Sequence, residues 1–352
     1  MRITAYATVR NEVPGPWAEQ LSSDDPWLAQ YLHAVADSYL ESSAPIMSLE
    51  VPHLIRHIRD TRRRYVFERD SIEGLQEWPV QANAVFEMPD RRVLNGAGED
   101  IMAGGAVPFL PVAVERAAKV RERVRKKTIL RMPSGYAPVR TEHEVVVRES
   151  HEVARRMMAL VVASELAAAM RARKPLPFEQ LRSALPDGFA SLSPLEAHFV
   201  ELVQGGAVDL RTKFMKPRAV AKQNAETREA AEIAHQLQFA AVAAQMLGHA
   251  VGWRPLPGDG LRVDPGKLIR EVIEAGQPTV YERCRELIAL PDLCEKHEFV
   301  RSMHWMARIG PSHPVRPVNM DELTAGSLAA WHRALAWLFS PGVEWEQADI
   351  ST

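Results

Sequence analysis

The stretch that decides the fold class spans residues 151–173 and reads HEVARRMMALVVASELAAAMRAR. Val153, Met157 and Leu160 recur at steps of four and three residues, which places them on one face of a helix. Ser150 stands immediately before this pattern and is predicted to be the N-cap. The stretch therefore predicts a long helix that buries one face against other helices.

Helical signals continue to the end of the sequence. Residues 193–196 read SPLE, a capping box with proline at the first helical position. Asp264 and Pro265 open another helix, which Gly276 can end. Further helices are predicted over 217–251 (with a break near Thr227), 279–290, 292–309 and 323–339. We therefore predict an all-α domain over residues 148–352.

The first 107 residues show mixed periodicity. Residues 2–10 alternate apolar and polar side chains, which predicts a strand. Asp25 and Pro26 provide an N-cap and a first-turn proline for a helix that ends at Glu41. A second short helix around Leu54 and short strands at 65–67, 84–88 and 91–94 complete the pattern. The predicted fold class is α+β, with a small N-terminal α+β domain (1–107) followed by the larger helical domain.

Residues 108–147 are predicted to form a basic helical linker and connection between the two domains. A basic surface on this helix could follow a phosphate backbone. Few aromatic residues are interleaved for base stacking, so a solvated connecting helix is the preferred interpretation and a nucleic-acid partner is not expected. The basic residues are Arg116, Lys119, Arg121, Arg123, Arg125, Lys126 and Lys127.

The composition is that of a globular protein. Of 352 residues, 46% are hydrophobic and 25% are charged, and the formal net charge of −2 disfavours a globally basic nucleic-acid binder. No apolar run reaches the length of a membrane span, and the first residues, MRITAYATVR, lack a signal-peptide core. Two cysteines do not suggest a disulfide framework. We expect a two-domain cytoplasmic protein without membrane contact.

Polar and aromatic side chains concentrate in the last predicted helices. His304 lies on an apolar stripe of one helix, and His332 lies at the edge of the apolar stripe of the next. The two histidines are interpreted either as buried, hydrogen-bonded core residues or as general bases in a pocket. Cys294 and His297 could share a metal ion but lack a third ligand, and the glycines near residue 100 form no phosphate-binding motif, so neither metal nor cofactor is predicted. The predicted pocket or polar cluster comprises His304, Trp305, His332, Trp337, Trp345 and Asp349.

An ordered set of weak motifs resembles one known family. These motifs are RESHEVARRMMAL at 148–160, LSPLE at 192–196, His304-Trp305, WHRALAWL at 331–338 and WEQADIST at 345–352. Together they resemble the bacterial domain-of-unknown-function family 4272 over about residues 127–352. The resemblance implies a helical bacterial protein without an established activity. The chain departs from the expected pattern at Ser302, Trp331 and Ala336, which weakens an enzymatic interpretation.

Two hypotheses of function follow. The preferred one is a non-enzymatic protein-binding module that acts as an adaptor or as an inhibitor of the immunity type, with another protein as its partner. The alternative is an enzyme or small-ligand receptor that uses the cluster on the late helices, with His304 or His332 as general base and Asp349 or another acid as its orienting group. The sequence favours a protein that is not an enzyme.

Overall fold

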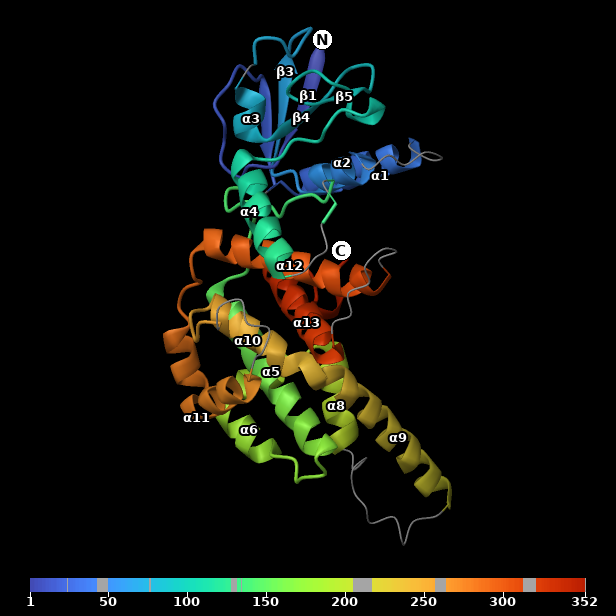
Figure 1. The fold of residues 1–352 in the computed structure, drawn as a ribbon, viewed down its shortest axis with the longest axis vertical. Coiled ribbons are helices and arrows are strands. Elements are labelled where there is room, and N and C mark those ends of the chain that lie inside the picture. Colours follow the sequence, from blue (N-terminus) through green and yellow to red (C-terminus); the bar gives the residue numbers. More distant parts are fainter. Residues whose placement is uncertain are drawn as a thin grey trace. The chain divides into compact units, whose positions relative to one another are not determined.

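A computed structural model describes residues 1–23, 25–42, 50–75, 77–127, 132–133, 135–204, 217–256, 264–312 and 321–351, with only the backbone at 42, 127 and 217–224 (Figure 1). The chain divides into two compact units. The sheet unit comprises Met1–Arg123 and Arg131–Val145, and the helical unit comprises Val124–Leu130 and Val146–Thr352. The predicted fold class is confirmed, because a small sheet region with a few helices precedes a larger helical region.

The sheet unit is built on a five-stranded sheet in the order β2-β3-β1-β4-β5, and each neighbouring pair is antiparallel. In the register, Ala5 of β1 lies opposite Tyr65 of β3 and Phe86 of β4. The elements of this unit are β1 (Arg2–Ala7), β2 (Glu19–Ser22), α1 (Pro26–Ser42), α2 (Glu50–Arg59), β3 (Arg63–Glu68), α3 (Trp78–Ala82), β4 (Ala84–Glu87), β5 (Val93–Leu94), η1 (Ile101–Ala103) and most of α4 (Pro111–Lys127).

Alternation along the strands buries side chains on both faces of the sheet. Tyr6 and Val85 belong to one core, which they share with apolar residues of α1 and α2. Ala5 and Phe86 belong to the other core, where Trp78 of α3 is included. The ring of Trp78 packs edge-on against Tyr65 at 5.0 Å between centroids. The sheet is therefore the middle layer of this unit.

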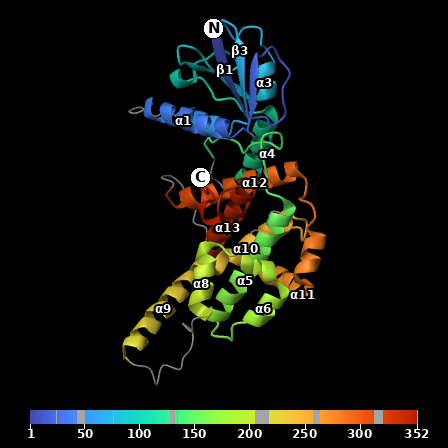
Figure 2. The same ribbon diagram turned by 180° about the vertical axis from the view of Figure 1, so that it is seen from behind.

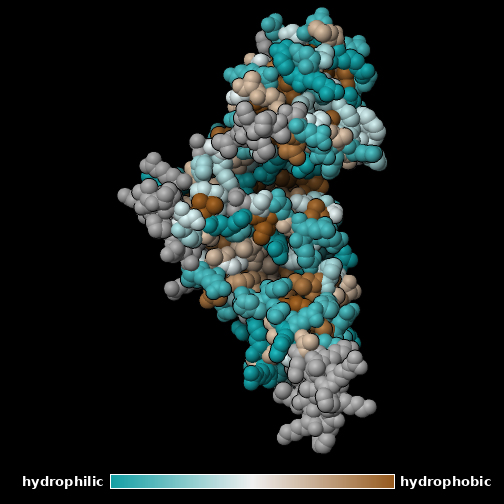
Figure 3. Space-filling view, turned by 90° about the vertical axis from the view of Figure 1, so that its right-hand side faces the viewer, coloured by the Kyte–Doolittle hydropathy of each residue, from teal (hydrophilic) through white to brown (hydrophobic). Residues whose placement is uncertain are grey.

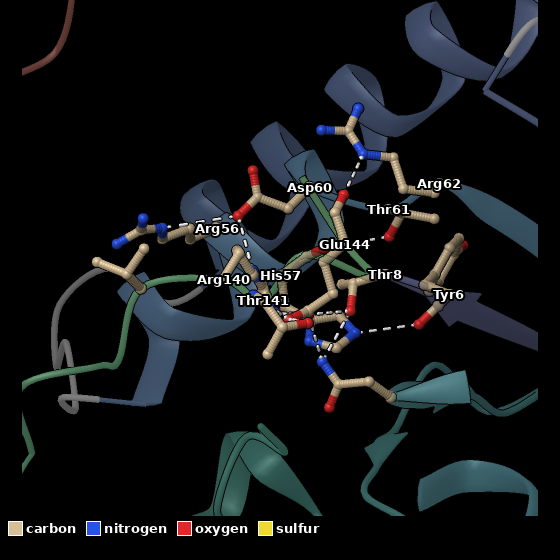
Figure 4. A network of polar contacts seen from close by, with 12 residues as sticks. Tyr6, Thr8, Arg56, His57, Asp60, Thr61, Arg62, Arg140, Thr141 and Glu144 are labelled. Carbon is tan, nitrogen blue, oxygen red and sulfur yellow. Dashed lines mark hydrogen bonds and ion pairs between the residues drawn. The ribbon is translucent and has the colours of Figure 1, made fainter. Parts of the chain in front are cut away.

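A buried carboxylate joins the segment that follows α4 to the sheet (Figure 4). Glu144 accepts hydrogen bonds from the hydroxyl of Thr8 (2.6 Å), the amide of Asn83 (3.0 Å) and the guanidinium of Arg140 (3.0 Å). The backbone N–H and hydroxyl of Thr141 donate to its other oxygen. Only 3% of Glu144 is exposed, and these donors hold its pKa below the usual value although burial opposes this.

The central helix of the helical unit is α5, which contacts α7, α8, α9, α10 and α11 (Figure 2). Its buried residues occupy nearly all sides of the helix, as expected for a central helix. The elements are α5 (Ser150–Arg171), α6 (Phe178–Ala184), α7 (Pro186–Ala190), α8 (Pro194–Gln204), α9 (Pro217–Gln236), η3 (Leu237–Phe239), α10 (Ala240–Ala250), α11 (Pro265–Arg283), α12 (Leu290–Ile309), η4 (Gly310–Ser312), α13 (Glu322–Leu338) and η5 (Trp345–Gln347). Within the described residues, no helix is long and apolar enough to cross a membrane.

Most predicted helix signals are confirmed, and three details are wrong. The predicted interruption at Gly276 is present (φ 71°, ψ 162°), but the helix predicted over 279–290 ends at Arg283. The Asp25 carboxylate accepts from the Trp27 N–H, and the Ser193 N–H donates to Glu196 in the predicted capping box. Ser150 is not the N-cap, because α5 begins at Ser150 itself and its hydroxyl donates to the Arg285 carbonyl instead.

The predicted break near Thr227 is also misplaced. The helix continues through Thr227 and is interrupted at Leu237–Phe239, where one 3₁₀ turn separates α9 from α10. A β-branched threonine weakens a helix without ending it. The interruption lies where the Phe239 ring packs on the backbone of α13 at Gly326, because a Cβ there would be 2.0 Å from that ring.

Candidate functional site

The two late-helix histidines contact each other directly. His304 of α12 and His332 of α13 place their Nδ1 atoms 2.9 Å apart, and they are 5% and 2% exposed. Burial, together with the positive charge of Arg308, lowers the pKa of His304 to about 4. His304 is therefore neutral at neutral pH, and one ring of the pair donates to the other, which joins α12 to α13.

A second histidine of α12 also lies beside His332. His297 of α12 stacks on Phe339 at 5.1 Å and lies 5.5 Å from His332 between ring centroids. Across the described ranges, no three histidine, cysteine, aspartate or glutamate residues are grouped closely enough to hold a metal ion.

Arg148, just before α5, and Arg156 of α5 organise the tryptophans at the C-terminal end. The guanidinium of Arg148 lies 4.0 Å from the ring of Trp337 and donates to the carbonyls of Trp337 and Ser340 (2.9 Å each), to the carbonyl of Val343 and to the carboxylate of Glu152. Arg148 thereby fixes the turn that follows α13 against the start of α5.

Arg156, in the second turn of α5, acts similarly. It forms a bidentate ion pair with Glu196 of α8 (2.6 and 2.8 Å), and its guanidinium carbon lies 4.4 Å from the centre of the Trp345 ring. The rings of Trp345 and Trp337 are 5.7 Å apart in an edge-on arrangement. Arginine supports such contacts because its planar cation can pair with a carboxylate and stack on an aromatic face together.

A polar cavity of about 540 Å³ opens beside these residues. Its walls come from the first turns of α5, the segment before α8 and the turn after α13. The residues that line it include Arg148, Glu152, Arg155, Arg156, Ser191, Ser193, Trp337, Glu344 and Trp345.

An apolar pocket of about 230 Å³ adjoins the polar cavity. Ser193, Glu196 of α8 and the Trp345 side chain border it, and Ser193 and Trp345 line both spaces. Most of the remaining lining is small or apolar, and the polar residues Gln236, Arg333 and Glu346 complete it. The small or apolar residues are Leu160, Leu195, Leu237, Phe239, Ala240, Ala243, Gly326, Ala329, Ala330 and Ile350. We refer to the polar cavity and the apolar pocket together as the Trp345 site. A group that enters both spaces must have polar and apolar parts close together.

Comparison with known proteins bears on this site. A family model described as "Domain of unknown function (DUF4272)" matches residues 116–348. The chain belongs to the DUF4272 family. No curated protein and no solved structure matches it. Trp337, Trp345 and the arginines that contact them all lie within the DUF4272 match, so the Trp345 site is built almost entirely from the family domain.

The structure separates the residues of the predicted pocket. Trp337 and Trp345 line the polar cavity, whereas His304 and His332 line neither space of the Trp345 site. Trp305 is half-buried on α12. Asp349 is exposed and accepts a hydrogen bond from the Ser351 N–H, and it lines neither space. The predicted cluster thus comprises a tryptophan part and a histidine part.

The predicted basic surface is smaller than its sequence suggested. Arg116 is buried and donates to the carbonyl of Arg140 (3.0 Å), and Arg121 donates to the carbonyl of Tyr136. Arg123 is half-buried, and the side chain of Lys127 lies outside the described residues. The exposed members are Lys119, Arg125 and Lys126.

Sequence reasoning overlooked the arginines of the DUF4272 domain as site residues. Arg155 and Arg156 stand in the apolar helical pattern of residues 151–173, where a buried cation requires a partner. That conflict was the available signal. It could not identify the partners, because Glu196 is 40 residues from Arg156.

Proposed function

We propose that this protein is a non-catalytic binding protein and that the Trp345 site holds an exposed segment of a partner polypeptide. This proposal rests on one observation: an apolar pocket the size of a single large side chain lies directly beside a polar cavity. Neighbouring residues of a polypeptide carry apolar and polar groups at this spacing. A module of this kind can serve as an adaptor or as an inhibitor of its partner.

The sizes of the two spaces support a polypeptide ligand. Pockets for drug-sized molecules measure roughly 300–1,000 Å³ and are mostly apolar. Here the apolar space of about 230 Å³ is smaller than that, and the larger space of about 540 Å³ is lined mainly by polar groups. Anchor pockets for one leucine or aromatic side chain are typical of protein interfaces.

An exposed apolar side chain extends the same surface of α13. Leu323 is 69% exposed, and Gly326 and Ala330 follow it at three and seven residues, on the same face of the helix. Exposed leucine beside an apolar pocket marks an interaction surface more often than an isolated exposed leucine does. On the face shown in Figure 3, apolar side chains form small brown patches separated by hydrophilic surface.

Site-specific photo-crosslinking in the source cells tests the proposal. A photoreactive amino acid at Glu346, an exposed residue that borders the apolar pocket, should attach to one polypeptide. The additional substitution Ala330→Phe fills the pocket and should abolish that adduct. Ala325→Phe places the same ring on the same helix outside the pocket lining and should leave the adduct unchanged.

The outcomes separate the two classes of ligand. An adduct that is insensitive to Ala330→Phe, or no polypeptide adduct, contradicts the proposal. If native mass spectrometry then shows a retained small molecule that is lost in Ala330→Phe, the site belongs to a small-ligand receptor. Ala330 is only half-buried, and circular dichroism and the melting temperature establish that the variant is folded. Ala329→Leu provides a smaller filling of the same pocket if it is not.

A further inference from the structure

We infer that the polar cavity of the Trp345 site binds a carboxylate of the partner segment and that Arg155 is its cationic contact. The inference rests on the proposed function and adds the chemistry of the ligand: an acidic side chain next to a large apolar one. Three arginines and two glutamates line the cavity, so its lining is positive overall.

The roles of two of the three arginines are already filled by contacts within the helical unit. Arg148 binds Glu152 and backbone carbonyls of the turn after α13, and Arg156 binds Glu196. Both are almost fully buried, at 7% and 5% exposure. Their charges are therefore largely balanced before any ligand enters.

Arg156 nevertheless retains one donor without an acceptor. Its Nε atom is buried and has no hydrogen-bond partner among the described residues, although the side chain lines the polar cavity. A buried N–H of this kind costs free energy unless an acceptor reaches it. Because this atom is closed to solvent, an entering ligand does not reach it, and Arg156 stays held by Glu196.

Arg155 is the arginine of the polar cavity that is available to a ligand. It is half-buried in the cavity wall, and in the described part of the chain it forms neither a hydrogen bond nor an ion pair. Partial burial strengthens its attraction for an anion relative to a fully solvated arginine, and its fork of donors matches the two oxygens of a carboxylate.

The acidic residues of the cavity lining favour a ligand whose single carboxylate has an uncharged neighbour. The Glu152 carboxylate is neutralised by Arg148, whereas Glu344 is exposed just before η5. Glu344 would repel a ligand with two adjacent negative charges. A single carboxylate at Arg155, with its apolar neighbour in the pocket beside Ala330, satisfies both spaces.

Ligand-observed saturation-transfer NMR on the full chain tests the inference with four capped dipeptides. These are acetyl-Asp-Leu-amide, acetyl-Leu-Asp-amide and their asparagine counterparts. At least one aspartate peptide should bind about tenfold more tightly than its asparagine counterpart, because the charged contact is absent from the amide. Arg155→Gln should reduce this ratio to about one, and Ala330→Phe should abolish binding of both peptides.

The control is Arg285→Gln, which removes an equally charged but 74% exposed side chain and should leave the ratio unchanged. Equal binding of aspartate and asparagine peptides, or a preference that persists in Arg155→Gln, overturns the carboxylate inference while the polypeptide site stands. No transfer to any peptide at 10 mM also overturns the inference, and the crosslinked adduct at Glu346 then decides the proposed function separately. Peptide binding that persists in Ala330→Phe contradicts both.

Discussion

Glu144→Gln is expected to destabilise the sheet unit strongly although it changes only one atom. The two oxygens of Glu144 accept five hydrogen bonds, three at Oε1 and two at Oε2. A glutamine must place its NH₂ group at one of these positions. At Oε1 the NH₂ faces the Arg140 guanidinium, and at Oε2 it faces the Thr141 backbone N–H. Neither group can accept a hydrogen bond.

The expected cost follows from these contacts. Loss of one buried hydrogen bond to a charged group costs about 1.5–3 kcal/mol, and removal of one partner of a buried ion pair costs about 3–5 kcal/mol. Arg140 retains Asp60 as an ion-pair partner at 3.0 Å, which limits the loss. We therefore expect about 3 kcal/mol of destabilisation.

Hydrogen–deuterium exchange measured on peptides from β1 and β4 is the appropriate assay, because it reports on the sheet unit without averaging over the helical unit. About 3 kcal/mol corresponds to a loss of protection of roughly a hundredfold. Glu19→Gln is the matched control, since it makes the same change in a surface ion pair with Arg2 that is more than half exposed and should cost under about 1 kcal/mol. If Glu144→Gln loses no more protection than Glu19→Gln, the five contacts do not stabilise the unit as argued.

Three further results are expected. Burial lowers the pKa of His57 to about 4, so the folded state favours the neutral ring. The free energy of unfolding is therefore fully retained above the unfolded pKa of about 6.5 and decreases as the pH falls from there toward 4. In urea titrations that follow the sheet unit, His57 should contribute a loss of about 2 kcal/mol between pH 7 and pH 5. That loss should be absent from His57→Gln, and an unchanged pH profile in the variant would contradict the assignment. Gly326→Ala should lower the free energy of unfolding by about 1–3 kcal/mol because its Cβ meets the Phe239 ring. In a double-mutant cycle measured by thermal unfolding, Phe239→Leu should recover part of that loss. Strict additivity of the two substitutions would show that the positions are not coupled. Burial raises the pKa of the Cys284 thiol to about 11. Iodoacetamide at pH 8 should therefore alkylate Cys284 in the folded protein roughly a hundredfold more slowly than an exposed thiol. Rapid labelling of the native chain would refute its burial.

The sequence by itself determined most of the long helices and the strands β1, β3, β4 and β5, but not β2 or the short helices α3, α6 and α7. These features depend on interactions between residues close together in the chain. The bond between Ser193 and Glu196 spans three residues, and so does the bond between Asp321 and Thr324 at the start of α13. Periodicity and capping residues therefore reveal them directly.

Only the tertiary structure decided which polar side chains meet. Arg148 reaches a carbonyl 189 residues away, Glu144 receives its shortest hydrogen bond from a residue 136 positions earlier, and His304 contacts a histidine 28 residues later. The sequence marks these side chains as polar groups on apolar faces, but their partners depend on how the helices and strands pack. Burial then forces each group to find whichever partner the packing places beside it, because an unpaired polar group in the interior is costly. For the same reason the sequence predicted Trp337 and Trp345 as site residues, whereas the arginines beside them and the two spaces of the Trp345 site became apparent only in the tertiary structure.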